Sequence, residues 1–146
     1  MTYTHVLDND ILSDLQRGDQ SIAAKLASVG WARVATTIVS GYEQLRGRFK
    51  QIGKAEQCRE RGKLPEAYRR LHETIDFFKG VPVLDYTDQA EQCHDELRRQ
   101  GVTLQKVAPL DLRTGCIALS LGATLVTRNR RHYEHVTGLR IEDWSS

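Results

Sequence analysis

The chain has 146 residues, enough for one domain with a real core, and we expect residues 1–146 to form a single domain. With 40% hydrophobic and 27% charged residues, it has the composition of an ordinary globular protein, which excludes long disorder. Its net charge of +2 is too small to indicate a nucleic-acid partner, so the placement of the charges must decide that question.

Cysteines and apolar runs set the expected compartment. The cysteines are Cys58, Cys93 and Cys116, an odd number with wide spacing, which argues against a disulfide framework and a zinc site. No apolar run approaches the roughly 20 residues that cross a bilayer, and no basic and then apolar signal segment opens the chain. We therefore expect a protein of the cytoplasm without a membrane partner.

The first half of the chain alternates short apolar strands with amphipathic helices. Apolar residues at helical spacing predict the helices, and short runs rich in β-branched residues predict buried strands. The predicted elements are a strand over 5–7, a helix from about 11 to Gly18, a helix over 21–29, a strand over 33–38 and a long helix from Ser40 toward Phe49.

Basic residues crowd into 46–63, and the alternation then resumes. Pro65 suits the first turn of a helix that continues to Phe78, and Thr87 suits the cap of the next helix. The remaining predictions are a strand over 81–84, helices over 88–99 and 111–121, a strand over 124–127 and an edge strand over 139–141.

Alternation of strands and helices indicates the α/β class, with a mostly parallel sheet of four to five strands covered by helices on both faces. In such sheets, ligands bind beyond the carboxyl ends of the strands. Four polar residues are predicted at this edge. They are Asp8 after the first strand, Glu43 early in the helix after the second, Asp111 at the start of the helix before the fourth, and Asn129 just after the fourth.

Clustered carboxylates repel one another, and a divalent cation removes that cost. Mg²⁺ and Mn²⁺ prefer oxygen ligands, activate water and polarise phosphoryl oxygens, so this set favours phosphodiester hydrolysis. Each residue also has a simpler interpretation. Asp8 would cap a helix, Glu43 would be a solvated helix residue, and Asp111 would complement a helix dipole.

Several segments resemble the motifs of VapC-like PIN-domain toxins. Residues 6–13 resemble an apolar strand followed by Asp-Thr-Asn-Ile-Leu, and 36–47 contain a Glu before a Leu and a Gly. Residues 111–116 resemble Asp-x-x-Ile-Ala-Ala. Residues 119–129, followed by His132-Tyr133 where the family often has Glu-Phe and then by 138–144, form the most specific match. The similarity covers nearly the whole chain and is weakest in the middle.

The resemblance implies a three-layer α/β/α PIN-like fold, RNA cleavage that depends on Mg²⁺ or Mn²⁺, homodimerisation and a cognate VapB-like antitoxin. By position, Asp8, Glu43 and Asp111 correspond to the acidic metal-site residues. Asn129 falls where many members have a fourth acid and others have Asn. Asp10 replaces the usual Asn; it would either supplement the missing fourth acid or cap the following helix, and we favour the capping role.

Basic side chains flank the acidic positions, as an RNA backbone would require. We expect Arg46 and Arg48 to contact RNA from the helix that carries Glu43, and Arg128, Arg130 and Arg131 to do so around Asn129.

Three other functions remain open. The Asp-Asn-Asp of 8–10 fits the opening of a haloacid-dehalogenase-type phosphatase, but the fourth strand ends in Thr127-Arg128-Asn129 rather than in an acidic pair. The neutral Asn129 leaves open a non-catalytic PIN-like module that binds RNA or protein. A structure-specific DNA nuclease of the wider superfamily is the third, although such enzymes are generally larger.

Overall fold

The structure is a computed structural model that describes residues 2–101 and 108–145. A five-stranded sheet in the order β3-β2-β1-β4-β5 forms its centre, and all four neighbouring pairs are parallel. The strands are β1 (His5–Leu7), β2 (Val34–Thr37), β3 (Val83–Leu84), β4 (Thr124–Val126) and β5 (Ile141–Glu142). The predicted α/β class and parallel sheet are thus confirmed.

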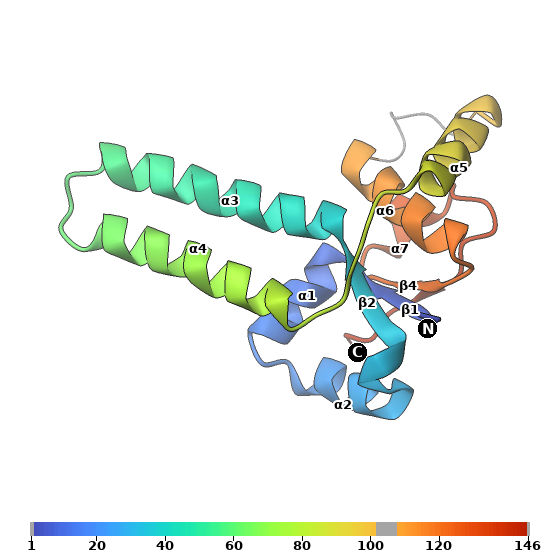
Figure 1. Cartoon of the computed structure of the whole chain (residues 1–146), viewed down its shortest axis with the longest axis horizontal. Helices are drawn as coiled ribbons and strands as arrows, with labels where there is room; N and C mark the ends of the chain where they lie inside the picture. Colours follow the sequence, from blue (N-terminus) through green and yellow to red (C-terminus); the bar gives the residue numbers. More distant parts are fainter. Residues whose placement is uncertain (1, 102–107, 146) are drawn as a thin grey trace.

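Helices follow the strands in the expected alternation (Figure 1). They are α1 (Asn9–Gln16), α2 (Gln20–Val29), α3 (Ile38–Gln57), α4 (Lys63–Lys79), α5 (Asp88–Arg99), α6 (Pro109–Ser120) and α7 (Arg130–Tyr133), with a short 3-10 turn at Trp31–Arg33. In the part of the chain that the structure describes, no helix has the length and apolar character needed to cross a membrane.

Neighbouring strand residues point to opposite faces of the sheet, so each face has its own core. Val6 and Leu125 pack with Ile117 of α6 and Leu97 of α5 on one face. Leu7 and Val126 face the other side, where α1, α2 and Trp144 cover the sheet. Helices on both faces make the three-layer α/β/α arrangement that the resemblance implied.

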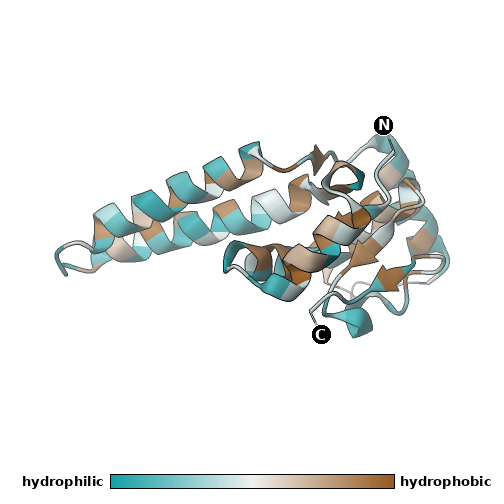
Figure 2. Cartoon of the chain, turned by 90° about the horizontal axis from the view of Figure 1, so that it is seen from below, coloured by the Kyte–Doolittle hydropathy of each residue, from teal (hydrophilic) through white to brown (hydrophobic). Residues whose placement is uncertain are grey.

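Helices α3 and α4 form an antiparallel hairpin that projects away from the sheet (Figures 1 and 2). We call the part of this hairpin beyond the sheet the arm. At 20 residues, α3 is about 30 Å long. The Arg48 Nε donates to Thr74 Oγ1 at 2.9 Å and joins the two helices. The distal end of the arm therefore lies away from the sheet by most of the length of α3.

Several predicted boundaries were wrong. The helix α3 begins at Ile38, because the Thr37 Oγ1 accepts from Ser40 N at 3.2 Å, and it continues to Gln57 rather than ending near Phe49. The edge strand β5 occupies 141–142 instead of 139–141. The short helix α7 was not predicted, although it carries two side chains of the candidate site.

Candidate active site

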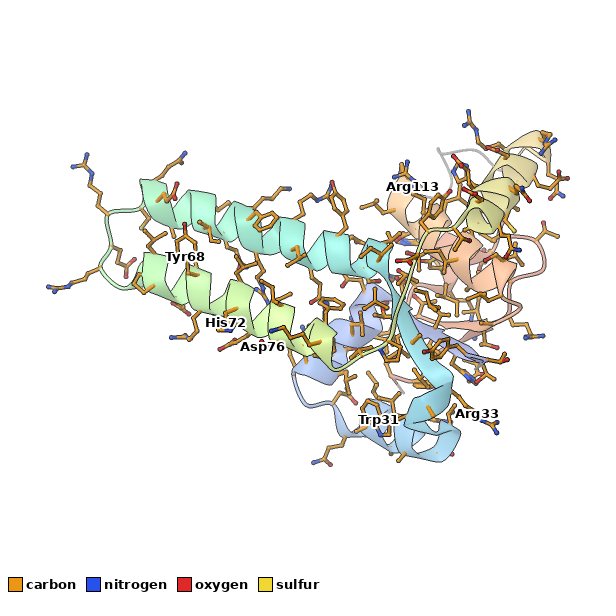
Figure 3. All side chains as sticks on the ribbon, in the orientation of Figure 1. Trp31, Arg33, Tyr68, His72, Asp76 and Arg113 are labelled. Atoms are coloured by element: carbon orange, nitrogen blue, oxygen red, sulfur yellow. The ribbon has the colours of Figure 1, made fainter. Side chains whose placement is uncertain are left out.

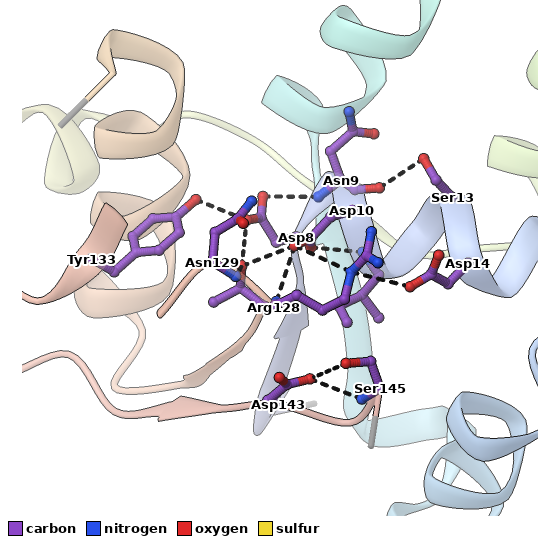
Figure 4. Close-up of polar contacts among 12 residues, drawn as sticks. Asp8, Asn9, Asp10, Ser13, Asp14, Arg128, Asn129, Tyr133, Asp143 and Ser145 are labelled. Carbon is purple, nitrogen blue, oxygen red and sulfur yellow. Dashed lines mark hydrogen bonds and ion pairs between the residues drawn. The ribbon is translucent and has the colours of Figure 1, made fainter. Parts of the chain in front are cut away.

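The candidate site lies at the carboxyl ends of β1 and β4, with Asp8 at its centre (Figure 4). The Asp8 side chain is buried and is the N-cap of α1. Its carboxylate accepts hydrogen bonds from Asn9 N at 2.8 Å, Thr127 Oγ1 at 2.9 Å and Tyr133 OH at 3.0 Å. Two of these donors approach the same oxygen, Oδ2, so Asp8 is held in one orientation.

Burial raises the pKa of Asp8 to about 6, and the charge of Asp10 adds to the shift, while the three hydrogen bonds oppose it. Burial and the nearby carboxylates raise the pKa of the Tyr133 hydroxyl. That hydroxyl therefore stays protonated and acts as a donor to Asp8.

Asp10 does not cap the helix, which corrects the expectation drawn from the sequence. Asp8 takes the N-cap position instead, and Asp10 accepts from Ile11 N at 2.7 Å within the first turn. Asp10 also accepts from Arg128 N at 3.0 Å and from Thr127 Oγ1 at 3.4 Å. It thus ties the start of α1 to the loop after β4, and burial raises its pKa.

Glu43 reaches the site from α3, one turn beyond the end of β2. Its Oε1 is buried and has no hydrogen-bond partner among the described residues. Burial raises the pKa of Glu43 to about 7, with further increases from the charges of Asp8 and Asp111 and a decrease from Arg46. Glu43 of α3 therefore senses the charges of Asp8 at the start of α1 and of Asp111 on α6.

Asp111 stands in the first turn of α6, and its Oδ2 lies 3.0 Å from His132 Nδ1 of α7. Asn129 is less engaged. Its side chain is exposed and does not cap α7, and its backbone N–H donates to Thr127 Oγ1 at 3.0 Å. The fourth predicted position is therefore at the rim of the site.

The donor set suits a hard divalent cation, because it consists of carboxylate oxygens, one of them buried without a partner. Burial first, and the charges of neighbouring carboxylates second, raise the pKa values of Asp8 and Glu43, and a bound cation would offset both costs. Across residues 2–101 and 108–145, however, no three Asp, Glu, His or Cys side chains stand close enough to hold an ion as placed. Metal binding would therefore draw these side chains together.

A groove of about 980 Å³ opens beside the carboxylates. Glu43 and Asp111 line it, together with Arg46, Arg113 and the aromatic rings of Tyr42 and Tyr86. Such an open groove with basic and aromatic walls admits a polymer chain.

The basic residues predicted to contact RNA separate into two sets. Arg46 lines the groove and stacks over Tyr42, with its guanidinium carbon 5.3 Å from the ring centroid. Arg48 instead donates to Thr74 and Gln51 within the arm, so it serves helix packing. Arg128, Arg130 and Arg131 line a smaller hollow of about 420 Å³ with Asn129 and His132.

Arg128 is partly engaged, because its Nε lies 3.3 Å from Asp14 Oδ2 and 3.9 Å from Asp10 Oδ2 (Figure 4). Arg130 reaches the Ile141 carbonyl at 3.4 Å. Arg131 is exposed. This segment of α7 and the loop before it brings cations to the rim of an acidic pocket.

Sequence reasoning missed the roles of Thr127 and Tyr133. Thr127 is fully buried, and its hydroxyl bridges the two carboxylates that follow β1. Tyr133 fills the core, with 1% of its surface exposed, and its hydroxyl also donates to Asp8. The signal that could have indicated these roles was the hydroxyl group that each residue brings into the buried core.

Known proteins resemble this chain in sequence and in fold. No protein-family model matches the chain. It is 40% identical over 90 residues to the tRNA(fMet)-specific endonuclease VapC of Shigella flexneri, and 38% identical over 89 residues to the protein of the same name in Salmonella typhimurium. The first match covers 59% of this chain and 64% of the relative, and the second covers 58% and 64%. The chain thus matches less than two thirds of the length of these curated relatives.

Solved structures match over nearly the whole chain. A DNA-bound VapBC structure from Salmonella typhimurium superposes with a TM-score of 0.72 at 27% identity, covering 98% of this chain and 99% of the other. VapBC-1 from nontypeable Haemophilus influenzae gives 0.69 at 22% identity, with coverage of 98% and 99%. The resemblance indicated by the sequence motifs is confirmed: this chain is similar in sequence to proteins named VapC and has the fold seen in solved VapBC structures.

Proposed function

We propose that this chain is an endoribonuclease that depends on Mg²⁺ or Mn²⁺ and serves as the toxin of a type II toxin–antitoxin pair. The observation that carries the proposal is the acidic pocket itself. Asp8, Glu43 and Asp111 come from three distant parts of the sequence, and burial together with the charges of Asp8 and Asp111 raises the pKa of Glu43. The names of the curated relatives, which are endonucleases specific for tRNA(fMet), support the same activity.

In this proposal Asp8, Glu43 and Asp111 hold the cation, with the Asn129 amide oxygen as a fourth group at the rim. When bound, such an ion lowers the pKa of water and polarises a phosphoryl oxygen. Thr127 and Tyr133 fix the Asp8 carboxylate, and their two bonds to Oδ2 leave Oδ1 as its better available ligand atom. Hydrogen bonds that orient a ligand in this way raise the affinity of its site for the metal.

The chain's cations would bind and orient the RNA backbone. Arg46 lines the groove together with Glu43, and Arg128, Arg130 and Arg131 line the smaller hollow that contains Asn129. Arg48 would take part only if its bond to Thr74 were broken, so we assign it to the arm. The rings of Tyr42 and Tyr86 offer surfaces on which unpaired bases stack.

The partners follow from the same relatives. The solved neighbours are VapBC complexes, some bound to DNA. We propose a VapB-like antitoxin, a homodimer and residence in the cytoplasm for this chain. Transfer RNA is the first substrate to test, because the curated relatives carry that specificity in their names.

Cleavage of unfractionated transfer RNA by the purified protein, with Mn²⁺ or with a chelator, tests the nuclease. We expect cleavage only with the ion, and none in Asp8→Asn. Asp19→Asn is the matched control, because Asp19 also caps a helix, α2, at a distance from the site, and asparagine caps equally well. Equal activity of wild type and Asp8→Asn would overturn the nuclease assignment, as would cleavage that survives the chelator.

Growth tests the toxin role separately. Expression without an antitoxin should arrest cells, and Asp8→Asn should relieve the arrest while Asp19→Asn does not. Normal growth despite abundant folded protein would contradict the toxin assignment and leave the nuclease chemistry standing.

A further inference from the structure

The distal end of the arm carries an exposed basic surface that the candidate site does not use. Residues 50–63 contain five Lys or Arg and two Asp or Glu, whereas the rest of the chain contains 16 basic and 17 acidic residues. The positive charge of this protein is therefore concentrated in a single segment, although the whole chain has a net charge of only +2. We call Lys50, Lys54, Arg59, Arg61 and Lys63 the distal patch.

The members of the distal patch are exposed, and no ion pair joins any of them to a described residue. The neighbouring arginines of α4 differ, because Arg69 pairs with Glu73 at 3.6 Å and Arg70 with Glu66 at 3.1 Å. These two acids of α4 are thus paired with arginines of the same helix, and the cations of the distal patch remain available to an outside anion. The acids among them are Glu56 and Glu60, which offset part of the charge.

The patch has a concave part and aromatic neighbours. A groove of about 310 Å³ between α3 and α4 is lined by Lys54, Lys63 and Arg70, with Glu66 already paired to Arg70. Phe49 on α3 and Tyr68 on α4 are 58% and 50% exposed. Figure 3 shows Tyr68 in the distal part of the arm, far from Arg33 on the body of the molecule. Cations interleaved with exposed rings favour single-stranded or looped nucleic acid.

We propose that the distal patch is a second RNA-binding surface, which grips a folded RNA at a point remote from the scissile bond. The inference rests on the proposed ribonuclease function. Glu43 and the end of α3 at Gln57 are separated by 14 residues of one helix, or about 21 Å. An RNA that fills both surfaces must extend over at least that distance. The patch therefore selects long or folded RNA over short fragments.

Changing all five patch residues to Gln tests the proposal. Binding is measured in an Asp8→Asn background, so that the RNA stays intact, with unfractionated transfer RNA and a hexanucleotide as probes. The matched control changes five exposed cations elsewhere to Gln, namely Lys25, Arg33, Lys79, Arg98 and Arg99. Size-exclusion chromatography of each variant reports whether the assembly is intact.

We expect the patch variant to bind transfer RNA at least about 10-fold more weakly at low salt, with hexanucleotide binding unchanged. Its plot of log Kd against log salt concentration should lose about two or more units of slope, because each released phosphate contact contributes about 0.7 to 0.9. In the active background, KM for transfer RNA should rise while kcat holds. The control should retain the wild-type slope and KM.

Several results would overturn the inference. Unchanged affinity and salt slope in the patch variant would remove the RNA contact. The same result with an altered oligomeric state would assign the patch to a protein contact instead. If wild type cleaves transfer RNA and the patch variant matches its KM, the inference alone fails. If Asp8→Asn binds no RNA and wild type cleaves none, both the inference and the proposed ribonuclease function fail.

Discussion

The two ends of helix α3 stand in opposite surroundings. Near its start, Glu43 lies in a half-buried pocket of like charges, where its pKa is raised to about 7. Near its end, Lys54 lies in water among other cations. A buried charge has a high desolvation free energy, so a counter-ion stabilises it strongly. Exposed charges stay hydrated, and many of them together can bind a large partner of opposite charge. One helix thus joins the proposed cation site to the proposed RNA-binding surface.

Loss of a pocket carboxylate should produce the largest effect. We expect Glu43→Gln and Asp111→Asn each to lower Mn²⁺-dependent RNA cleavage by about 10³-fold, because the chemistry rests on a bound ion worth several kcal/mol. The melting temperature of the metal-free protein should hold or rise, since repulsion is relieved.

Cleavage rates and melting curves of these two variants are compared with Glu91→Gln, which changes an exposed acid in the first turn of α5. Near-normal activity in both pocket variants would contradict the proposed difference between the two ends of α3, because substitutions at the start of the helix would then affect cleavage no more than substitutions at its end.

Acidity should also affect the pocket strongly. The folded-state pKa values of Asp8 and Glu43, about 6 and about 7, exceed the values near 4 expected for the unfolded chain. The folded state therefore holds these protons more tightly, and stability is greatest below about pH 4 for these groups and falls as pH rises to about 7. Asp8 alone accounts for a decrease on the order of 3 kcal/mol.

Denaturant unfolding in the presence of a chelator, at steps between pH 4 and pH 7.5, measures this decrease. Asp8→Asn should flatten the curve, and Asp19→Asn should leave it as in wild type. A wild-type stability that falls no more steeply over this range than that of Asp8→Asn would contradict the burial of the Asp8 charge at the start of α1.

Much of this comparison was predictable from the chain itself. Asp8 follows an apolar strand and Glu43 follows a β-branched one, and the carboxyl ends of parallel strands meet at one edge. The partners of Asp8 were not predictable. Thr127 and Tyr133 lie 119 and 125 residues away, and only tertiary packing decides which hydroxyl reaches the carboxylate.

The arm shows the opposite limit. The sequence indicated the basic segment but ended α3 near Phe49, because Gly47, Gly53 and the crowd of cations interrupt the apolar pattern. The helix continues because α4 packs along it, with Arg48 bonded to Thr74. A local pattern cannot show such support from a partner that begins beyond a loop.

The Tyr133 hydroxyl should have an intermediate effect on the pocket. Tyr133→Phe removes one donor to Asp8 and keeps the ring in its place against Gly115. We expect Mn²⁺ affinity, measured by calorimetric titration, to fall about 10-fold, as is usual when a ligand loses its supporting hydrogen bond. Tyr42→Phe, at an exposed ring on the groove wall, is the control and should retain the affinity of wild type. Equal affinity in all three proteins would leave Thr127 as the only hydroxyl that positions Asp8.

Within the arm, the hydrogen bond from Arg48 to the buried Thr74 hydroxyl should contribute about 1 kcal/mol of coupling. A double-mutant cycle of Arg48→Met and Thr74→Val, read by denaturant unfolding, measures it. The same variants should leave Mn²⁺ affinity unchanged, because the arm and the pocket depend on separate contacts. A change in metal affinity would show instead that the two ends of α3 are coupled through the helix.

Asn129 should give the smallest effect, because it lies at the border between the acidic pocket and a basic segment. Asn129→Asp adds a charge to the proposed ligand set, so Mn²⁺ affinity should tighten by a few-fold. A fourth acid that faced the other carboxylates would lower the stability of the metal-free protein through repulsion. The Asn129 side chain is instead exposed and shares its hollow with Arg128, Arg130 and Arg131. Their charges offset the repulsion, so the metal-free melting temperature should hold. Calorimetric titration with Mn²⁺ beside metal-free and metal-bound melting curves tests both parts. Unchanged affinity would place Asn129 outside the metal site, whereas a marked metal-free destabilisation would mean that its side chain turns toward Asp8 rather than toward the arginines.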